Sequence, residues 1–279
     1  MESINYFTNE NKDYFKNKHI LITGATGGIG KVLVNTLYNL DANMCLISHN
    51  EDKLKKTFIS IFNENSQKNN IKYEILDLEN PNKITYQFPS IMKKLKGRLD
   101  ILIMCHGKYN QSLITNCEIK TFDEMININV RSTMHILSLS VPFLKMSKGN
   151  CVIISSMESI IPVNYGFLNS MTKSMINSLI QCSALELASF GVRINGVAPG
   201  VTNTKHRIND IFTEENNKKY IKEYSNMFLL NQNVLKAEDI VNSILFLASD
   251  DADFMTGEII ENDNGYSLNH DFSYSSDNL

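Results

Sequence analysis

The sequence of 279 residues contains no long hydrophobic run and no excess of positive charge. No stretch approaches the roughly 20 apolar residues that a membrane-spanning helix needs, so we expect no membrane partner. The formal net charge of −3 provides no basic field for the phosphates of DNA or RNA. We therefore expect no nucleic acid partner either.

Cysteine is also scarce: the chain has 5 cysteines, an odd number, and no two of them form a CxxC pair. This pattern predicts reduced thiols, with no metal site and no disulfide framework, as is typical of a cytosol-like compartment. The first residues, MESINYFTNENKDYFKNK, are polar and include acids. They lack the apolar run of a signal peptide and the arginine-rich composition of a transit peptide, so we expect a cytoplasmic protein.

Short apolar runs rich in β-branched residues alternate along the chain with longer segments of helical periodicity. Strands are predicted at residues 19–24, 43–48, 71–78, 99–105, 150–156, 192–199 and 257–262. Helices are predicted at residues 28–40, 51–65, 84–96, 121–146, 165–190 and 238–249. Nearly continuous apolar strands that alternate with helices are typical of a parallel sheet buried on both faces. The pattern predicts a doubly wound α/β fold with a mostly parallel, seven-stranded sheet.

The domain organisation is predicted to be simple, because no low-complexity linker and no repeat of fixed period divides the chain. We expect one domain at residues 18–267. Residues 1–17 are expected to form a flexible N-terminal extension, and residues 268–279 a C-terminal tail.

The segment TGATGGIGK directly follows the first predicted strand and opens the first predicted helix. Gly24 would permit the tight turn, Gly28 would let the backbone approach a pyrophosphate, and Gly30 would let helix and strand pack closely. The N-terminus of the helix offers free N–H groups and a favourable dipole to phosphates. Glycines also punctuate ordinary loops, but a glycine-rich turn at the start of a strand–turn–helix unit predicts a dinucleotide site.

Six ordered motifs carry a resemblance to the short-chain dehydrogenase/reductase family. TGATGGIG is similar to the TGxxxGxG signature of that family, and the other five motifs are Asp77 after the third strand, ININV with Asn129, IISS with Ser156, VRINGVAPGVTNT and FMTGEIIENDNG. The resemblance covers nearly the whole chain. It implies a Rossmann-type domain with helices on both faces of the sheet, a nicotinamide cofactor, and a small carbonyl or alcohol substrate. It also implies a homodimer or homotetramer that assembles through the helices at 121–146 and 165–190.

The resemblance further implies a set of cofactor-binding residues, with Asp77 at the adenine ring and Thr204 near the nicotinamide carboxamide. Taken singly, Asp77 would be only a carboxylate at a strand end and Thr204 only a helix cap. The whole implied set is Gly24, Thr26, Gly28, Ile29, Gly30, Ser48, His49, Asp77, Leu78, Gly107, Lys173, Pro199, Gly200, Thr202 and Thr204.

The end of the second strand bears on the choice of nucleotide. An acid at this point suits the ribose 2′-hydroxyl of NAD, whereas a nearby arginine suits the 2′-phosphate of NADP. Ser48 leaves no carboxylate to repel a phosphate, and His49 stands where an arginine often occurs. This favours NADP(H) over NAD(H), although His49 would equally suit a surface imidazole without a role.

The catalytic residues implied by the resemblance are Ser156 for the substrate oxygen, Lys173 for the nicotinamide ribose, and Asn129 for a water linked to the lysine. The tyrosine that acts as the acid in this family precedes the lysine by four residues and follows the serine by thirteen. Both spacings lead to Asn169. An asparagine amide donates and accepts hydrogen bonds but does not ionise, so it does not deliver a proton to an alkoxide.

Two other residues are considered as proton donors. On a helix, Tyr165 would lie about 40° round and about 6 Å towards the N-terminus from position 169, so it would serve only if it lay in a loop folded over the site. Enoyl reductases of the superfamily place six residues between an earlier tyrosine and the lysine, whereas seven follow Tyr165 here. His106 lies in MCHG, which replaces the family's NNAG. With a pKa of about 6.5 it would shuttle a proton or simply occupy a strand-end turn.

Two functions therefore stay open at this point. One is an NAD(P)(H)-dependent oxidoreductase with an unidentified carbonyl or alcohol substrate and an atypical active site. The other is a pseudoenzyme that binds a cofactor or a partner, since loss of a general acid costs about 10²- to 10⁴-fold in rate without abolishing cofactor binding. The polar segment 204–230 is expected to form a lid over the substrate pocket, but its sequence does not identify a substrate.

Overall fold

The computed structural model describes residues 13–59, 61, 63, 70–204, 228–230 and 234–269, so most of the expected lid at 204–230 lies outside it. Its strands form a seven-stranded sheet in the order β3-β2-β1-β4-β5-β6-β7, and all six neighbouring pairs are parallel. The strands are β1 (His19–Thr23), β2 (Asn43–Ser48), β3 (Ile71–Ile75), β4 (Ile101–Met104), β5 (Asn150–Ile154), β6 (Arg193–Pro199) and β7 (Ile259–Asn262). The predicted seven-stranded sheet is confirmed.

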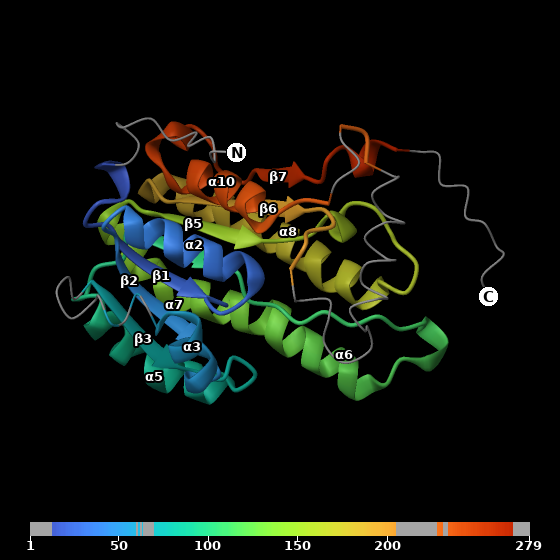
Figure 1. Ribbon diagram of the computed structural model, residues 1–279, viewed down its shortest axis with the longest axis horizontal. Coiled ribbons are helices and arrows are strands. Elements are labelled where there is room, and N and C mark those ends of the chain that lie inside the picture. The colour runs from blue at the N-terminus through green and yellow to red at the C-terminus, as the bar shows by residue number, and fades with distance from the viewer. Residues whose placement is uncertain are drawn as a thin grey trace.

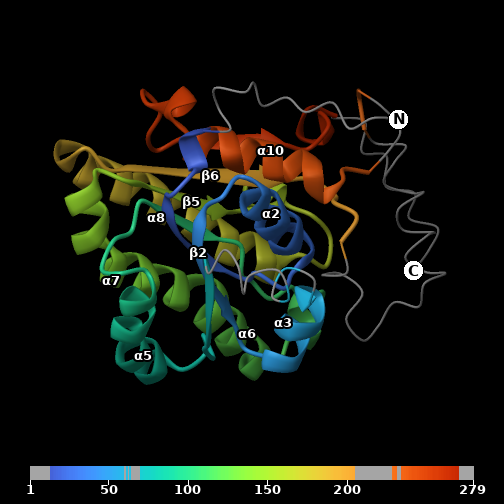
Figure 2. The same ribbon diagram turned by 60° about the vertical axis from the view of Figure 1, so that its left-hand side comes forward.

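Helices cover both faces of this sheet (Figures 1 and 2). They are α2 (Gly28–Asn39), α3 (Glu51–Thr57), α5 (Pro81–Lys94), α6 (Ile119–Met125), α7 (Ser132–Ser147), α8 (Phe167–Leu187) and α10 (Ala237–Ala248). Apolar side chains of α2, α3 and α10 pack into one hydrophobic core, and those of α5, α7 and α8 pack into another. The doubly wound α/β fold is therefore confirmed.

The order of the strands places a switch point between β1 and β4. From β1 the chain proceeds outwards to β2 and β3, and it then returns to place β4 on the other side of β1. In open parallel sheets, ligands bind in the crevice outside the carboxyl ends of the strands at such a point. The topology alone therefore indicates where the site lies.

Several helix boundaries differ from those predicted. Helix α5 begins at Pro81 because Asn80 caps it, its side chain accepting a hydrogen bond from the Lys83 N–H at 3.1 Å. Helix α8 begins only at Phe167, and Tyr165 precedes it with a φ of +62°. The helix predicted at 121–146 is divided by a π-helical segment, η2 (Ile126–Arg131), which separates α6 from α7.

The boundary expected at residue 18 falls inside the packed domain. Phe15 is fully buried in the core beneath α2 and α10, and its ring meets that of Tyr14 edge-on with centroids 5.1 Å apart. Residues 13–17 therefore belong to the domain rather than to a loose extension. Across the residues described here, none of the helices has the length and hydrophobicity that crossing a bilayer requires.

Candidate active site

A pocket opens at the carboxyl edge of the sheet, where the topology predicts a ligand site. It brings together five segments far apart in sequence: the β1–α2 turn, the end of β4, the end of β5, helix α8, and the loop after β6. The residues that line it are Gly27, Gly28, Ile29, Gly30, Cys105, His106, Gly107, Tyr109, Ile154, Ser155, Ser156, Asn169, Lys173, Pro199, Gly200, Thr202 and Thr204.

The turn between β1 and α2 has the geometry of a phosphate cradle. Gly24 has a φ of +69°, and a Cβ atom there would lie 2.5 Å from the backbone nitrogen of His106. A Cβ atom at Gly30 would overlap the carbonyl oxygen of Gly24. The first turn of α2 contains no acidic residue and its N-cap, Gly27, provides no side-chain cap. The free N–H groups and the dipole of α2 therefore fit the pyrophosphate of a dinucleotide.

Lys173 extends from α8 towards the pocket and is only 8% exposed. Its Nζ donates a hydrogen bond of 2.7 Å to the carbonyl oxygen of Ile154, at the end of β5. Burial lowers the pKa of this lysine to about 8. A Cβ atom at Gly107 would lie 3.7 Å from the lysine Nζ, so this glycine keeps the space before the ammonium group open.

Asn129 lies in the π-helical segment η2 and connects two parts of the site. Its Oδ1 accepts a hydrogen bond from the Lys108 N–H at 2.7 Å, and its Nδ2 donates to the Lys108 carbonyl at 2.9 Å. The same Nδ2 donates to Thr172 Oγ1 at 3.1 Å, one residue before Lys173. Asn129 thus fixes the loop after β4 to α8, and π-helical segments are frequent at functional sites.

Asn169 occupies the position that both family spacings assign to the catalytic tyrosine. It is 5% exposed, lines the pocket, and donates a hydrogen bond of 2.8 Å from Nδ2 to Glu158 Oε2. Ser156 also lines the pocket, and its Oγ accepts a hydrogen bond from the Glu158 N–H at 3.2 Å. The structure therefore brings Ser156, Asn169 and Lys173 together, with a carboxamide in place of a phenol.

Two polar residues of the site, Glu158 and Tyr109, were missed by the sequence analysis. Glu158 is only 3% exposed, and Tyr109 lines the pocket. The Tyr109 hydroxyl donates to Glu158 Oε1 at 3.4 Å, while Gln111 Nε2 donates to the same hydroxyl at 3.3 Å. Tyr109 lies two residues after Gly107, and Glu158 lies two residues after Ser156. Since β4 and β5 are neighbours, that spacing is the signal that would have placed them together.

His106 is a neutral imidazole that hydrogen-bonds to residues of both β1 and α7. Its Nδ1 lies 2.6 Å from Thr23 Oγ1, and its Nε2 lies 2.8 Å from Ser132 Oγ and 3.1 Å from Thr133 Oγ1. Burial and the charge of Lys173 lower its pKa to about 3. At neutral pH the imidazole carries no extra proton for a shuttle, and it instead ties β1 to α7.

The remaining predicted site residues do not line this pocket. Tyr165 is 45% exposed, and its carbonyl accepts a hydrogen bond from the Ser112 N–H at 2.9 Å. Ser48 is buried at the end of β2, while His49 and Asp77 are exposed. The predicted residues outside the lining are Gly24, Thr26, Ser48, His49, Asp77, Leu78, Asn129 and Tyr165. Their roles at the cofactor stay predictions. Within the described segments, no cluster of three or more His, Cys, Asp or Glu residues is arranged to hold a metal ion.

Comparisons with known proteins agree with this geometry. A family model described as enoyl-(acyl carrier protein) reductase matches residues 24–267. The chain is 26% identical to the 7alpha-hydroxysteroid dehydrogenase of Bacteroides fragilis over 92% of this chain and 96% of the relative. A short-chain type dehydrogenase/reductase from Mycobacterium ulcerans superposes with a TM-score of 0.81 at 26% identity and 91% coverage of each chain. A tyrosine-to-phenylalanine variant of ElxO with NADPH bound superposes with a TM-score of 0.79 at 29% identity, covering 90% of this chain and 98% of that one. This chain belongs to the short-chain dehydrogenase/reductase family.

Proposed function

We propose that this protein is an NAD(P)(H)-dependent oxidoreductase that interconverts a carbonyl group and an alcohol on a small molecule. The observation that carries the proposal is the convergence of the glycine turn, Ser156 and Lys173 on one pocket at the carboxyl edge of the sheet. A related dehydrogenase and an NADPH-bound structural relative support a nicotinamide cofactor. The substrate itself is an unidentified carbonyl or alcohol.

Different residues of the pocket have different roles in this reaction. The N-terminus of α2 would hold the pyrophosphate, and the Lys173 ammonium would hold a ribose hydroxyl. When bound, the cofactor supplies or accepts the hydride. Ser156 faces the pocket and would donate a hydrogen bond to the substrate oxygen, where negative charge develops during reduction. Asn169 would orient that oxygen but does not supply a proton.

The pseudoenzyme alternative is kept because of one specific observation. Asn169 donates its amide to the buried Glu158, so the position of the family's acid is occupied by a stable hydrogen bond rather than an ionisable group. In this alternative the pocket binds the nucleotide for structural or partner-binding purposes. A solved tyrosine-to-phenylalanine variant of ElxO with NADPH bound shows, for that protein, that nucleotide binding tolerates the loss of a phenol.

Binding and turnover measured on the same protein separate the two functions. Calorimetric titration with NADPH and NADH tests the cofactor site, and Gly30→Val, which would collide with the turn at Gly24, is its negative control. Turnover is then measured with a panel of ketones, aldehydes and hydroxysteroids, in wild type and in Asn169→Tyr. Turnover by the wild type supports the oxidoreductase. Binding without turnover in the wild type, together with activity in Asn169→Tyr, would establish the pseudoenzyme.

Three finer features complete the proposal. NADP(H) is favoured over NAD(H), supported by the absence of a carboxylate at the buried Ser48. A homodimer or homotetramer is supported by exposed apolar side chains on α7 and α8, among them Met134, Met171 and Met175. A cytoplasmic location is supported by the five cysteines, all of which are free thiols. Gel filtration with light scattering tests the assembly.

A further inference from the structure

The proposed reaction needs a proton source that the glycine turn, Ser156 and Lys173 do not by themselves identify. When a carbonyl carbon gains a hydride, the carbonyl oxygen needs one proton to become a hydroxyl. In the reverse direction the alcohol must lose that proton. Since Asn169 does not ionise, the proton must pass through another group at the pocket.

The proton-bearing side chains on the pocket wall can be compared one by one. Burial raises the pKa of the Cys105 thiol to about 12, so this thiol is a weaker acid than an ordinary phenol. His106 is neutral at physiological pH and both its ring nitrogens face hydroxyl groups of the protein. The Lys173 ammonium donates one hydrogen bond to the Ile154 carbonyl, and the proposed function assigns its other N–H groups to the nicotinamide ribose. Among the described residues of the wall, the remaining ionisable side chain is that of the half-buried Tyr109.

The Tyr109 hydroxyl is fixed by two neighbours. It donates to Glu158 Oε1 at 3.4 Å and accepts from Gln111 Nε2 at 3.3 Å. The second oxygen of the same carboxylate accepts from Asn169 Nδ2 at 2.8 Å. One buried carboxylate therefore bridges the phenol and the position where the family's acid stands.

Glu158 itself is held where a carboxylate is stabilised. It is 3% exposed and lies beside the first residues of α8, since a Cβ atom at Gly166 would lie 3.1 Å from Glu158 Oε2. Gly166 is the N-cap of α8 and provides no side-chain cap. The positive end of the helix dipole and the charge of Lys173 on the same helix both favour a negative group at this point.

We propose that Tyr109 is the catalytic acid and base of this pocket, and that Glu158 exchanges protons with it, in place of a tyrosine at position 169. The inference rests on the proposed oxidoreductase function. In alcohol oxidation, the phenol oxygen takes the alcohol proton as the carbon loses its hydride, the phenol proton passes to the Glu158 carboxylate, and the resulting carboxyl group releases it to water. Reduction runs through the same transfers in reverse and begins with the uptake of a proton from water by the carboxylate.

A double-mutant cycle between positions 109 and 169 tests the assignment. Tyr109→Phe in the wild-type background should lower kcat by about 10²- to 10³-fold with little change in the Kd for NADPH. In the Asn169→Tyr background, where a phenol again stands four residues before Lys173, the same substitution should cost less than about tenfold. A purely structural role of Tyr109 would give equal losses in both backgrounds and would overturn the proposal.

Two further measurements keep the test decisive if Asn169→Tyr does not fold. In the wild-type background, Tyr165→Phe should retain far more activity than Tyr109→Phe, and the opposite order would overturn the proposal. Glu158→Gln should lower kcat for alcohol oxidation by at least about tenfold with little change in the Kd for NADPH, because an amide accepts no proton. An unchanged kcat would remove Glu158 from the relay.

The matched control is Tyr86→Phe, a phenol 86% exposed on α5, which should leave kcat and KM unchanged. The outcomes also separate this inference from the proposed function. Absence of wild-type turnover across the panel would refute the oxidoreductase itself. Wild-type turnover that is unaffected by Tyr109→Phe would refute only the assignment of Tyr109.

Discussion

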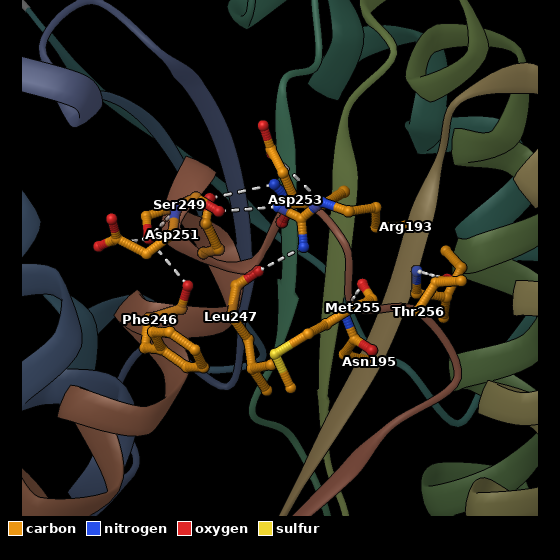
Figure 3. A network of polar contacts seen from close by, with 12 residues as sticks. Arg193, Asn195, Phe246, Leu247, Ser249, Asp251, Asp253, Met255 and Thr256 are labelled. Atoms are coloured by element: carbon orange, nitrogen blue, oxygen red, sulfur yellow. Dashed lines mark hydrogen bonds and ion pairs between the residues drawn. The ribbon is translucent and has the colours of Figure 1, made fainter.

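The two edges of the parallel sheet both bury charged side chains, but they hold them in different ways. At the amino edge, the Arg193 guanidinium at the start of β6 donates 2.9 Å hydrogen bonds to the carbonyls of Leu247 and Ser249. Asp253 Oδ1 lies 3.9 Å from its Nε (Figure 3). Asn195, further along β6, binds the Met255 carbonyl at 2.8 Å in the same network. This network fixes the chain that runs from α10 to β7.

The buried Asp100 shows the same style of pairing at the amino edge. Its carboxylate accepts from the His19 N–H at 2.8 Å, and each of its oxygens accepts from Arg98 Nε at 3.0 Å. The first residue of β1 is thereby joined to the residue that directly precedes β4. The buried charges of Arg193 and Asp100 are thus paired with neighbouring groups of the protein, none of which lines the pocket.

At the carboxyl edge the buried groups face an open pocket instead. Lys173 is buried and lines the pocket, its one described hydrogen bond goes to the Ile154 carbonyl, and burial lowers its pKa to about 8. Glu158 is shared between a phenol and an amide that both line the pocket. The difference between the two edges shows that burial of a charged side chain does not by itself indicate a functional site. What distinguishes the site is a buried charge whose neighbours also reach a cavity.

The largest expected effect comes from Lys173→Met. Removal of the ammonium should lower kcat/KM by about 10³-fold, because ribose binding and support of the proton transfer are lost together. In the wild type the ammonium form dominates below a pKa of about 8, so the affinity for NADPH should fall as the pH rises above 8, and in the variant this fall should be absent.

Lys94→Met is the matched control, since Lys94 pairs with Glu74 at the β3 side of the sheet, away from the pocket. Its activity should stay close to that of the wild type. Equal activity losses in the two lysine variants would break the contrast between the edges.

The opposite edge is tested by Arg193→Met. Two charged hydrogen bonds, to the carbonyls of Leu247 and Ser249, are lost, so the free energy of unfolding should fall by about 3 kcal/mol. Urea denaturation measures this change, while kcat per folded molecule should stay unchanged. A large fall in kcat without loss of stability would show that the amino edge also serves catalysis.

The sequence allowed the fold and half of the site to be predicted, for identifiable physical reasons. Apolar periodicity predicted every strand, because a sheet buried on both faces leaves nearly continuous apolar runs. Ordered motifs predicted Ser156, Lys173 and Asn169. Tyr109 and Glu158 were missed because each lies two residues beyond a motif residue, and this spacing gains meaning only once β4 and β5 are known to be neighbours.

Two smaller errors have equally local causes. Phe15 was assigned to a loose extension because a single aromatic residue in a polar segment gives no periodic signal, yet it is fully buried. Helix α8 was predicted to begin at Tyr165, whereas the positive φ of that residue and the N-cap at Gly166 delay the start to Phe167.

A smaller effect is expected at His106. This residue lies at the carboxyl edge, but both its ring nitrogens are paired with protein hydroxyl groups, as the buried groups of the amino edge are paired with protein groups. The pKa of His106 is about 3 in the folded protein and 6.5 in the unfolded chain. Between pH 3 and pH 6.5 the unfolded chain therefore binds a proton at this residue and the folded protein does not. Stability should therefore fall as the pH drops from 6.5 towards 3. In His106→Asn this fall should be shallower, by up to about 1.4 kcal/mol per pH unit. Urea denaturation at several pH values measures the difference, and parallel curves for the two proteins would contradict a neutral, structural His106.

The smallest expected effect concerns Ser48, at the end of β2. Its Oγ lies 3.2 Å from both the nitrogen and the carbonyl oxygen of Asn50, the N-cap of α3. In Ser48→Asp the new carboxylate would accept the same N–H at a helix start, so the protein should stay folded. It would also repel a 2′-phosphate, so the ratio of NADPH to NADH affinity should fall about tenfold, a difference of about 1.4 kcal/mol. Ser48→Ala, which removes the hydroxyl without adding charge, should leave that ratio unchanged. If calorimetry gave the same ratio in all three proteins, the end of β2 would have no part in nucleotide choice. The functional part of the carboxyl edge would then be limited to β1, β4, β5 and β6, the strands that border the pocket.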